Sequence, residues 1–199
     1  MKTLISRVII PAVVATIIVI SAIFGFAGAL NQGTTSTKYA KWMNSLDDNT
    51  SLRNVNMPGS HDTMATYGIG DFAGHCQSLS LNDQLNLGVR FLDIRLKQDR
   101  KVLRATHGFI DQKATFSQIN ETVTNFLNDN PTEFIIMSIK EETKASNPIG
   151  SFEDCLKEYL NDKYVLSREV PEKVGDVRGK IVLLSRYPNS TIGIEAFSG

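Results

Sequence analysis

The chain of 199 residues has only two cysteines and no excess of charge of either sign. Two cysteines are too few for a small domain built on disulfides. Because 21 basic residues balance 21 acidic ones, the net charge gives no electrostatic reason to expect nucleic acid as a partner. The motifs G-x-S-x-G, Walker A and H-E-x-x-H are missing too, which leaves a serine hydrolase, a nucleotide kinase and a compact zinc-protease site unsupported.

The balanced charge is an average over two unlike segments. Residues 1–40 contain Lys2, Arg7 and Lys38 and no acidic residue, so the remainder holds 18 basic and 21 acidic side chains, a net charge near −3. A mildly acidic domain is not drawn to an anionic membrane by its overall charge. Contact with a membrane surface therefore has to come from local features.

The segment 8–30 is an uncharged apolar run of 23 residues. About 20 such residues suffice for a helix to cross the hydrocarbon core of a bilayer. Lys2 and Arg7 precede the run, so its amino-terminal end is expected in the cytoplasm. Residues 1–30 are then either a signal peptide, cleaved near Ala27-Gly28-Ala29, or an uncleaved membrane anchor. Both interpretations predict a secreted or extracytoplasmic protein, anchored in the second case through residues 8–30.

Residues 31–40 are mostly small and polar and are interpreted as a linker. Residues 41–199 are then long enough for one domain with its own core. Cys76 and Cys155 fall in this domain. In an oxidising compartment they could form a disulfide, but two buried free thiols fit the sequence equally well.

Apolar runs alternate with helical patterns along the domain, which predicts an α/β fold of right-handed βαβ units with a parallel sheet. The predicted strands are Arg53–Met57, Val89–Leu96, Val102–Thr106, Phe134–Ile139 and Ile181–Leu184. The predicted helices are Leu79–Leu87, Thr115–Asn128 and Phe152–Leu160.

Ionisable residues stand repeatedly at the carboxyl ends of the predicted strands. They are His61, Asp62, Asp93, Arg95, His107, Lys140 and Arg186. Because these ends share one face in barrels and open parallel sheets, we expect the seven side chains to converge. Taken singly, most could be ordinary surface residues. Asp93 and Arg95 are harder to dismiss, since they share one strand face inside an apolar run.

The residue types suggest cleavage of a phosphodiester without a metal. Two histidines can serve as base and acid near neutral pH, and an arginine fork suits a phosphate. A metal site is the competing interpretation, with possible ligands His61, Asp62, His75, Asp93 and Glu142. Arg95 argues against a cation at this position because it would repel one.

Five stretches of sequence, in order, resemble the catalytic X-type domain of the bacterial phosphatidylinositol-specific phospholipase C family. They are MPGSHDT (57–63), GVRFLDIR (88–95), HG (107–108), NPTEFIIMSIK (130–140) and RGKIVLLSRY (178–187). The resemblance implies a TIM-type (β/α) barrel that cleaves phosphatidylinositol to diacylglycerol and inositol 1,2-cyclic phosphate. The expected enzyme is formally a lyase, with no cofactor and no metal.

The same resemblance implies a role for each matched residue. His61 would be the general base and His107 the general acid, assisted by Asp62. Arg95 would bind the phosphate, at the position where related eukaryotic enzymes place calcium, and Asp93 would support it from the same strand. Two further residues, Lys140 and Arg186, would bind inositol hydroxyls.

The sequence departs from the family in its length. A barrel of this kind usually needs about 250 residues, and the pattern here predicts about five strands, so residues 41–199 are interpreted as an incomplete barrel. The family's later strands carry an aspartate for the base histidine and an aspartate and a tyrosine for the inositol ring, and none can be placed here. Two alternatives stay open: an impaired, membrane-anchored lipid- or inositol-phosphate-binding remnant, and a metal-dependent glycerophosphodiester phosphodiesterase.

Overall fold

The computed structural model describes residues 37–68, 73–145 and 147–196. The predicted apolar span 8–30 lies outside these residues, and within them no helix is long and apolar enough to cross a membrane. The carbonyl groups of Tyr39 and Ala40 accept hydrogen bonds from the Arg90 guanidinium, at 3.4 and 2.8 Å. The last two residues of the predicted linker therefore contact the folded domain.

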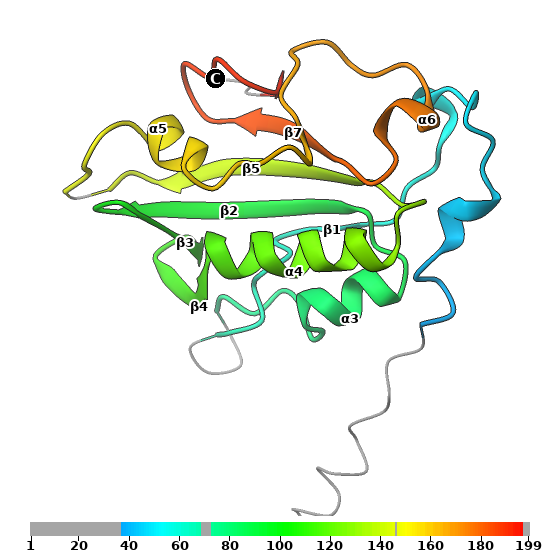
Figure 1. Ribbon diagram of the computed structural model, residues 1–199. Helices are drawn as coiled ribbons and strands as arrows, with labels where there is room; N and C mark the ends of the chain where they lie inside the picture. The colour runs from blue at the N-terminus through cyan, green and yellow to red at the C-terminus, as the bar shows by residue number, and fades with distance from the viewer. Residues whose placement is uncertain (1–36, 69–72, 146, 197–199) are drawn as a thin grey trace, which may run out of the picture. The chain divides into compact units, whose positions relative to one another are not determined.

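A single open sheet organises the domain (Figure 1). Its strands are β1 (Gly59–Ser60), β2 (Phe91–Asp99), β3 (Val102–His107), β4 (Ile110–Thr115), β5 (Ile135–Thr143), β6 (Tyr164–Val165), β7 (Ile181–Arg186) and β8 (Ile194–Glu195). The strand order is β4-β3-β2-β5-β7-β6, with β1 also paired to β2 and β8 to β7. Pairing is parallel throughout except in β2-β3-β4. The predicted α/β class is confirmed.

The sheet has five parallel positions among the described residues. β1, β2, β5 and β7 fill four of them in chain order. β6 and β8 share the fifth, because β5 occupies the whole of one edge of β7 and both short strands pair along the other. The number matches the predicted truncation after about five strands, although the predicted strand Val102–Thr106 does not fill one of these positions.

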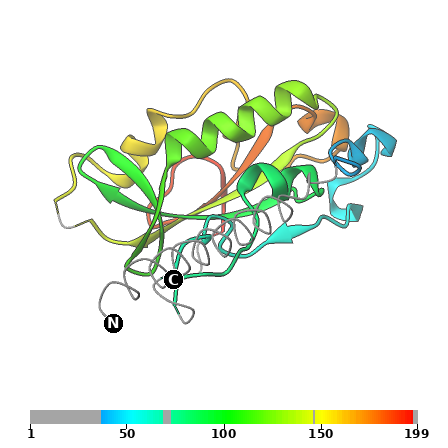
Figure 2. The ribbon, with the colours of Figure 1, turned by 90° about the horizontal axis from the view of Figure 1, so that it is seen from below.

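Helix α4 (Phe116–Asp129) lies along one face of the sheet (Figure 2). A capping box formed by Thr115 and Gln118 begins it, and its buried residues recur at helical spacing. The helix ends before Pro131, which cannot continue it. Three shorter helices are α3 (Leu81–Asn86), α5 (Phe152–Lys157) and α6 (Val174–Val177), and two 3-10 turns are η2 (Trp42–Ser45) and η3 (Leu52–Asn54).

The pleat of the strands separates the main apolar face from a face that is apolar near Val182 and Ile136 and charged at its carboxyl end. The main core joins buried residues of α4 to alternate residues of the central strands, which are Leu92, Ile94 and Leu96 of β2, Ile135, Met137 and Ile139 of β5, and Ile181 and Leu183 of β7. The residues between them point to the opposite face. At its carboxyl end that face presents Asp93, Arg95, Lys140, Glu142 and Arg186. Covering one face with helices thus turns these ionisable side chains toward the other.

The sequence prediction was wrong in three respects. The predicted first strand, Arg53–Met57, contains the end of η3, and the strand forms later, at Gly59–Ser60. The third, Val102–Thr106, is real but antiparallel, because β2 runs on to Asp99 and turns back directly. Strands β4, β6 and β8 were not predicted; β4 is largely polar, and the other two have two residues each.

Glu153 at the start of α5 fastens that helix to the loop after β7. Its carboxylate accepts hydrogen bonds from Thr191 N–H at 2.7 Å, Lys157 Nζ at 2.7 Å and the Tyr187 hydroxyl at 3.1 Å. Burial by itself would raise the pKa of Glu153, but these hydrogen bonds lower it to about 2.

Candidate active site

Three cationic side chains form a row across adjacent strands. The sheet register pairs Arg95 of β2 with Lys140 of β5, and Lys140 with Arg186 of β7. Neighbouring strands lie about 4.8 Å apart, so the row spans about 10 Å. Like charges placed directly opposite one another repel. The row therefore needs carboxylates between its members, an anionic ligand, or both.

Asp93 supplies the first of these carboxylates and is buried. Its Oδ2 accepts from Arg95 Nη2 and from Asp62 N–H, both at 3.1 Å, and its Oδ1 accepts from Arg186 Nη1 at 2.8 Å. Burial would raise the pKa of Asp93, but these hydrogen bonds and the two guanidinium charges hold it below its usual range. Burial would likewise lower the pKa of Arg95, yet its carboxylate partners raise it.

Glu142 supplies the second carboxylate, and the sequence reasoning named it only as a possible metal ligand. It lies 2.6 Å from Lys140 Nζ and 3.3 Å from Arg95 Nη1, and it accepts from Gly108 N–H at 3.4 Å. Burial would raise its pKa, but the hydrogen bond from Lys140 and the nearby charges lower it. The sequence did contain a signal for this contact. Glu142 follows Lys140 by two positions, and residues i and i+2 of a strand share a face.

The turn after β1 carries His61 and Asp62 to this face. Asp62 has a φ of +46°, a left-handed conformation that aspartate tolerates better than most residues. Buried Thr63 holds the turn against β2: its N–H donates to the Asp93 carbonyl at 3.0 Å, and its hydroxyl accepts from Asp93 N–H at 2.8 Å. The turn therefore cannot move independently of the strand that carries Asp93 and Arg95.

Both matched histidines contact the Asp62 carboxylate. His61 Nε2 lies 3.1 Å and His107 Nε2 lies 3.4 Å from Asp62 Oδ2, while Arg95 Nε lies 2.5 Å from Oδ1. The Asp62 side chain is 1 % exposed, whereas that of His61 is 71 % exposed and open to a ligand. His61 Nδ1 also lies 3.2 Å from Asp93 Oδ2. The histidine expected to lack a carboxylate partner thus has one from β2.

The structure brings together all seven residues that the sequence singled out. His61, Asp62, Asp93, Arg95, His107 and Arg186 are joined by direct contacts, and Lys140 is joined to them through Glu142. This arrangement can hold a phosphate between guanidinium groups, with one imidazole on either side of a shared carboxylate.

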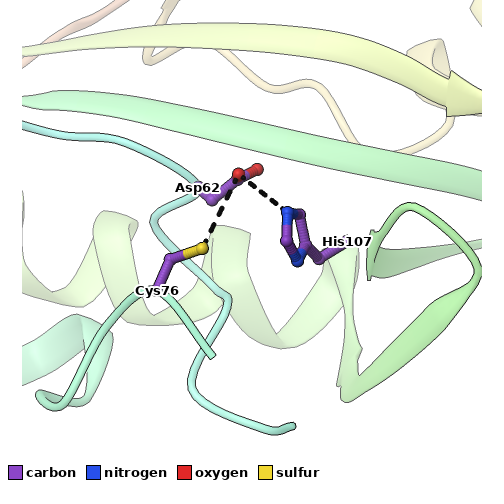
Figure 3. A group of neighbouring side chains, drawn as sticks. All are labelled: Asp62, Cys76 and His107. Atoms are coloured by element: carbon purple, nitrogen blue, oxygen red, sulfur yellow. Dashed lines mark hydrogen bonds and ion pairs between the residues drawn. The ribbon is translucent and has the colours of Figure 1, made fainter. Parts of the chain in front are cut away.

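The Cys76 thiol lies beside the same carboxylate (Figure 3), a position that was not predicted for it. Cys76 and Cys155 are both free, so the disulfide alternative is wrong; Cys76 is exposed and Cys155 buried. Cys76 Sγ is 4.0 Å from Asp62 Oδ2. Partial burial and the charge of Asp62 raise the pKa of this thiol.

Within the part of the chain that the structure describes, two groups of side chains have the composition of a metal site. One is Asp62, Cys76 and His107, and the other is His61, Asp62 and Asp93; within each group one ligand atom per residue lies within 4.8 Å of the others. In the second group Arg95 donates to the carboxylate oxygen that a metal would need. In the first group Arg95 contacts Asp62 only through Oδ1, and Oδ2 has the His61 and His107 imidazoles as its neighbours.

Comparison with known proteins identifies the family. The family model described as phosphatidylinositol-specific phospholipase C, X domain, matches residues 55–187. The chain belongs to this family. It is 36 % identical over 158 residues to the 1-phosphatidylinositol phosphodiesterase of Listeria monocytogenes, covering 73 % of this chain and 48 % of the relative. It is 28 % identical over 164 residues to the Staphylococcus aureus enzyme of the same name, covering 76 % and 52 %.

Solved structures from this family share the fold. The phosphatidylinositol-specific phospholipase C of L. monocytogenes superposes with a TM-score of 0.67 at 33 % identity, covering 81 % of this chain and 64 % of that one. The H258Y mutant of the S. aureus enzyme gives 0.72 at 25 % identity, covering 84 % and 59 %. The predicted partial barrel of the phosphatidylinositol phosphodiesterase kind is confirmed. The chain spans about half the length of the curated relatives it matches.

Proposed function

We propose that this chain cleaves the phosphodiester bond of phosphatidylinositol. The observation that carries the proposal is the shared carboxylate. His61 and His107, which lie 46 positions apart in the sequence, both contact buried Asp62, and Arg95 contacts the other oxygen of the same group. A base, an acid and a phosphate-binding guanidinium thus lie around one point. Membership of a family whose members include 1-phosphatidylinositol phosphodiesterases supports the choice of substrate.

In the proposed reaction the inositol 2-hydroxyl attacks its own phosphate. His61 takes the hydroxyl proton, and the imidazolium that forms lies between two carboxylates, with Nδ1 at 3.2 Å from Asp93 Oδ2 and Nε2 at 3.1 Å from Asp62 Oδ2. A bond forms between phosphorus and this oxygen, and the bond to the glycerol oxygen breaks. His107, paired with Asp62, protonates the leaving oxygen. The products are inositol 1,2-cyclic phosphate and diacylglycerol, and no metal takes part.

The cation row supplies binding for the headgroup. Arg95 neutralises charge that develops on the phosphate oxygens. Lys140 and Arg186, one and two strands away, donate to inositol hydroxyls within the span of about 10 Å set by the strand spacing. Arg186 is held by Asp93 and Lys140 by Glu142, so both donors are oriented before the ligand arrives.

A lipid substrate requires contact with a membrane surface. Phe109, two residues beyond His107 in the β3–β4 turn, is 87 % exposed and can enter the interfacial layer of a bilayer. We propose an extracytoplasmic location, on the strength of the apolar segment 8–30, as a signal peptide or as an anchor.

The test is cleavage of phosphatidylinositol in detergent micelles by the full chain in the presence of a chelator. Phosphorus NMR of the water-soluble product distinguishes a cyclic phosphate from an open monoester. We expect the cyclic product, and we expect His61→Ala and His107→Ala each to abolish its formation. The third histidine, His75, is exposed and lies outside the contacts described above, so His75→Ala is the matched control and should retain activity.

Three other outcomes would contradict the proposal in different ways. Inositol phosphate binding without turnover would identify a binding remnant. Activity that appears only when a divalent ion replaces the chelator would favour a metal-dependent glycerophosphodiester phosphodiesterase. Activity that survives loss of both histidines would locate the chemistry elsewhere.

A further inference from the structure

One reactive group next to His107, the proposed general acid, has no role in the proposed reaction. The Cys76 thiol, the Asp62 carboxylate and the His107 imidazole face one another (Figure 3). Asp62 Oδ2 lies 3.4 Å from His107 Nε2 and 4.0 Å from Cys76 Sγ, and a ligand atom from each of the three lies within 4.8 Å of the others. A carboxylate, a thiol and an imidazole, all able to bind a metal, therefore lie around one small volume.

The fold fixes the position of the thiol. The N–H groups of Cys76 and Gln77 both donate to the Ala65 carbonyl, at 2.8 and 2.9 Å. The Gln77 side-chain amide also donates to the His61 carbonyl at 2.6 Å. The Cys76 backbone is thus tied to the same turn that carries Asp62, which holds the thiol on the side of the carboxylate.

The donor set selects a particular class of metal. Thiolate and imidazole are ligands of zinc, and they are poorly suited to magnesium or calcium, which prefer oxygen. A tetrahedral zinc ion holds such donors about 3.3–3.8 Å apart. Closing the present cluster onto zinc requires donor shifts of about 1 Å, which side-chain rotation provides. The fourth coordination position stays open for water.

We propose that Asp62, Cys76 and His107 form a zinc site, and that zinc bound there switches off the proposed phospholipase reaction. The inhibitory half rests on the proposed function, because it follows from the metal occupying the acid and its carboxylate. On binding, the Cys76 S–H bond is replaced by a sulfur–zinc bond and the proton leaves to solvent. No electron is transferred.

The positive charge of Arg95 would repel a metal ion, but three carboxylates compensate this charge next to the cluster. The guanidinium contacts Asp62 through Oδ1, Asp93 through Oδ2 and Glu142 through Oε1. It leaves Asp62 Oδ2, the oxygen nearest the thiol, without a guanidinium partner among the described residues. The Cys76 thiolate adds a further negative charge toward the zinc.

The decisive experiment measures binding rather than turnover. The full chain, purified in chelator and then freed of it, is titrated with zinc chloride by calorimetry, and with cobalt(II) as a spectroscopic substitute. We expect one ion per chain and a thiolate-to-cobalt absorption band. Loss of a supporting residue around a metal typically costs about 10–100-fold in affinity, so loss of a direct ligand in Cys76→Ser should cost about 100-fold or more and remove the band. Cys155→Ser, the matched thiol control, should keep both.

Activity provides the second arm. Zinc should inhibit phosphatidylinositol cleavage by the wild-type chain, chelator should restore it, and Cys76→Ser should keep its metal-free activity while resisting zinc. Equal zinc affinity in wild type and Cys76→Ser, or bound cobalt without a sulfur band, would overturn the proposal. A chain that binds zinc through Cys76 but never cleaves the lipid would refute the proposed function and leave the site standing.

Discussion

Replacing Asp93 with asparagine tests the electrostatic core of the site. Both carboxylate oxygens accept from donors: Oδ2 from Arg95 and from Asp62 N–H, and Oδ1 from Arg186. An asparagine must turn its NH₂ group toward one of these sets, so no orientation of the amide satisfies both. Hydrogen bonds to charged groups contribute about 1.5–3 kcal/mol each. Since Arg95 keeps its contacts with Asp62 and Glu142, we expect Asp93→Asn to lower the free energy of unfolding by about 2–4 kcal/mol at pH 7.

The pH dependence of this loss gives a sharper test than its size. The pKa of Asp93 is lowered in the folded state, so its stabilising contribution is complete above the unfolded-state value of about 4 and disappears as pH falls through the lower folded value. Urea unfolding should therefore separate wild type from Asp93→Asn at pH 7 and bring the two together in acid. Asp99→Asn, at the exposed end of the same strand, should change stability by less than about 0.5 kcal/mol. A constant gap between wild type and Asp93→Asn at both pH values would refute the reasoning.

Three further predictions follow from other contacts. Glu153→Gln should lower the free energy of unfolding by about 2–3 kcal/mol at pH 7. In urea unfolding the difference from wild type should disappear between pH 4.5 and about 2, because the folded-state pKa of Glu153 is about 2. A full difference at pH 2 would contradict this origin. Arg95→Lys keeps the charge but not the fork, so kcat on phosphatidylinositol micelles should fall about 100-fold or more with KM little changed, and an unchanged kcat would remove Arg95 from the transition state. Phe109→Ser should weaken sedimentation with phosphatidylinositol vesicles about tenfold while sparing cleavage of a water-soluble inositol phosphodiester, whereas equal loss on both substrates would indicate a catalytic or structural role.

The central strands and the long helix were predictable because their sequences carry strong local patterns. β5 and β7 each begin with a mostly apolar run, and the buried positions of α4 recur at spacings that only a helix places on one face. β4 was not predictable, because its sequence is mostly polar and its buried Gln112 is accommodated by hydrogen bonds with Tyr67 N–H and the Gly74 carbonyl. Such contacts come from segments far away in the sequence, which periodicity does not report.

The residues near the candidate site could be predicted from the sequence, but the contacts between their side chains could not. Strand-end position identified the ionisable residues, since the carboxyl ends of parallel strands meet. It could not show that His61 reaches Asp93, because that contact depends on how the turn after β1 is held by Thr63. Glu142 was undervalued for a related reason: its role depends on β5 continuing as a strand to Thr143, beyond the apolar run from which the strand was predicted.

The position of His107 shows how a departure from the predicted topology serves the site. In a regular βαβ unit the acid would stand at the end of its own parallel strand. Here β2 continues past Arg95 to Asp99, and β3 returns with Leu96 opposite Ala105. The pairing of β2 with β3 ends at this pair, whose side chains both face the apolar core, so a regular continuation would turn His107 toward that core as well. The register of β3 is irregular between Arg104 and Thr106, and a shift of one residue turns the following side chains of a strand to the other face. This irregularity in the returning strand, more than the strand-end rule, accounts for His107 lying within reach of Asp62.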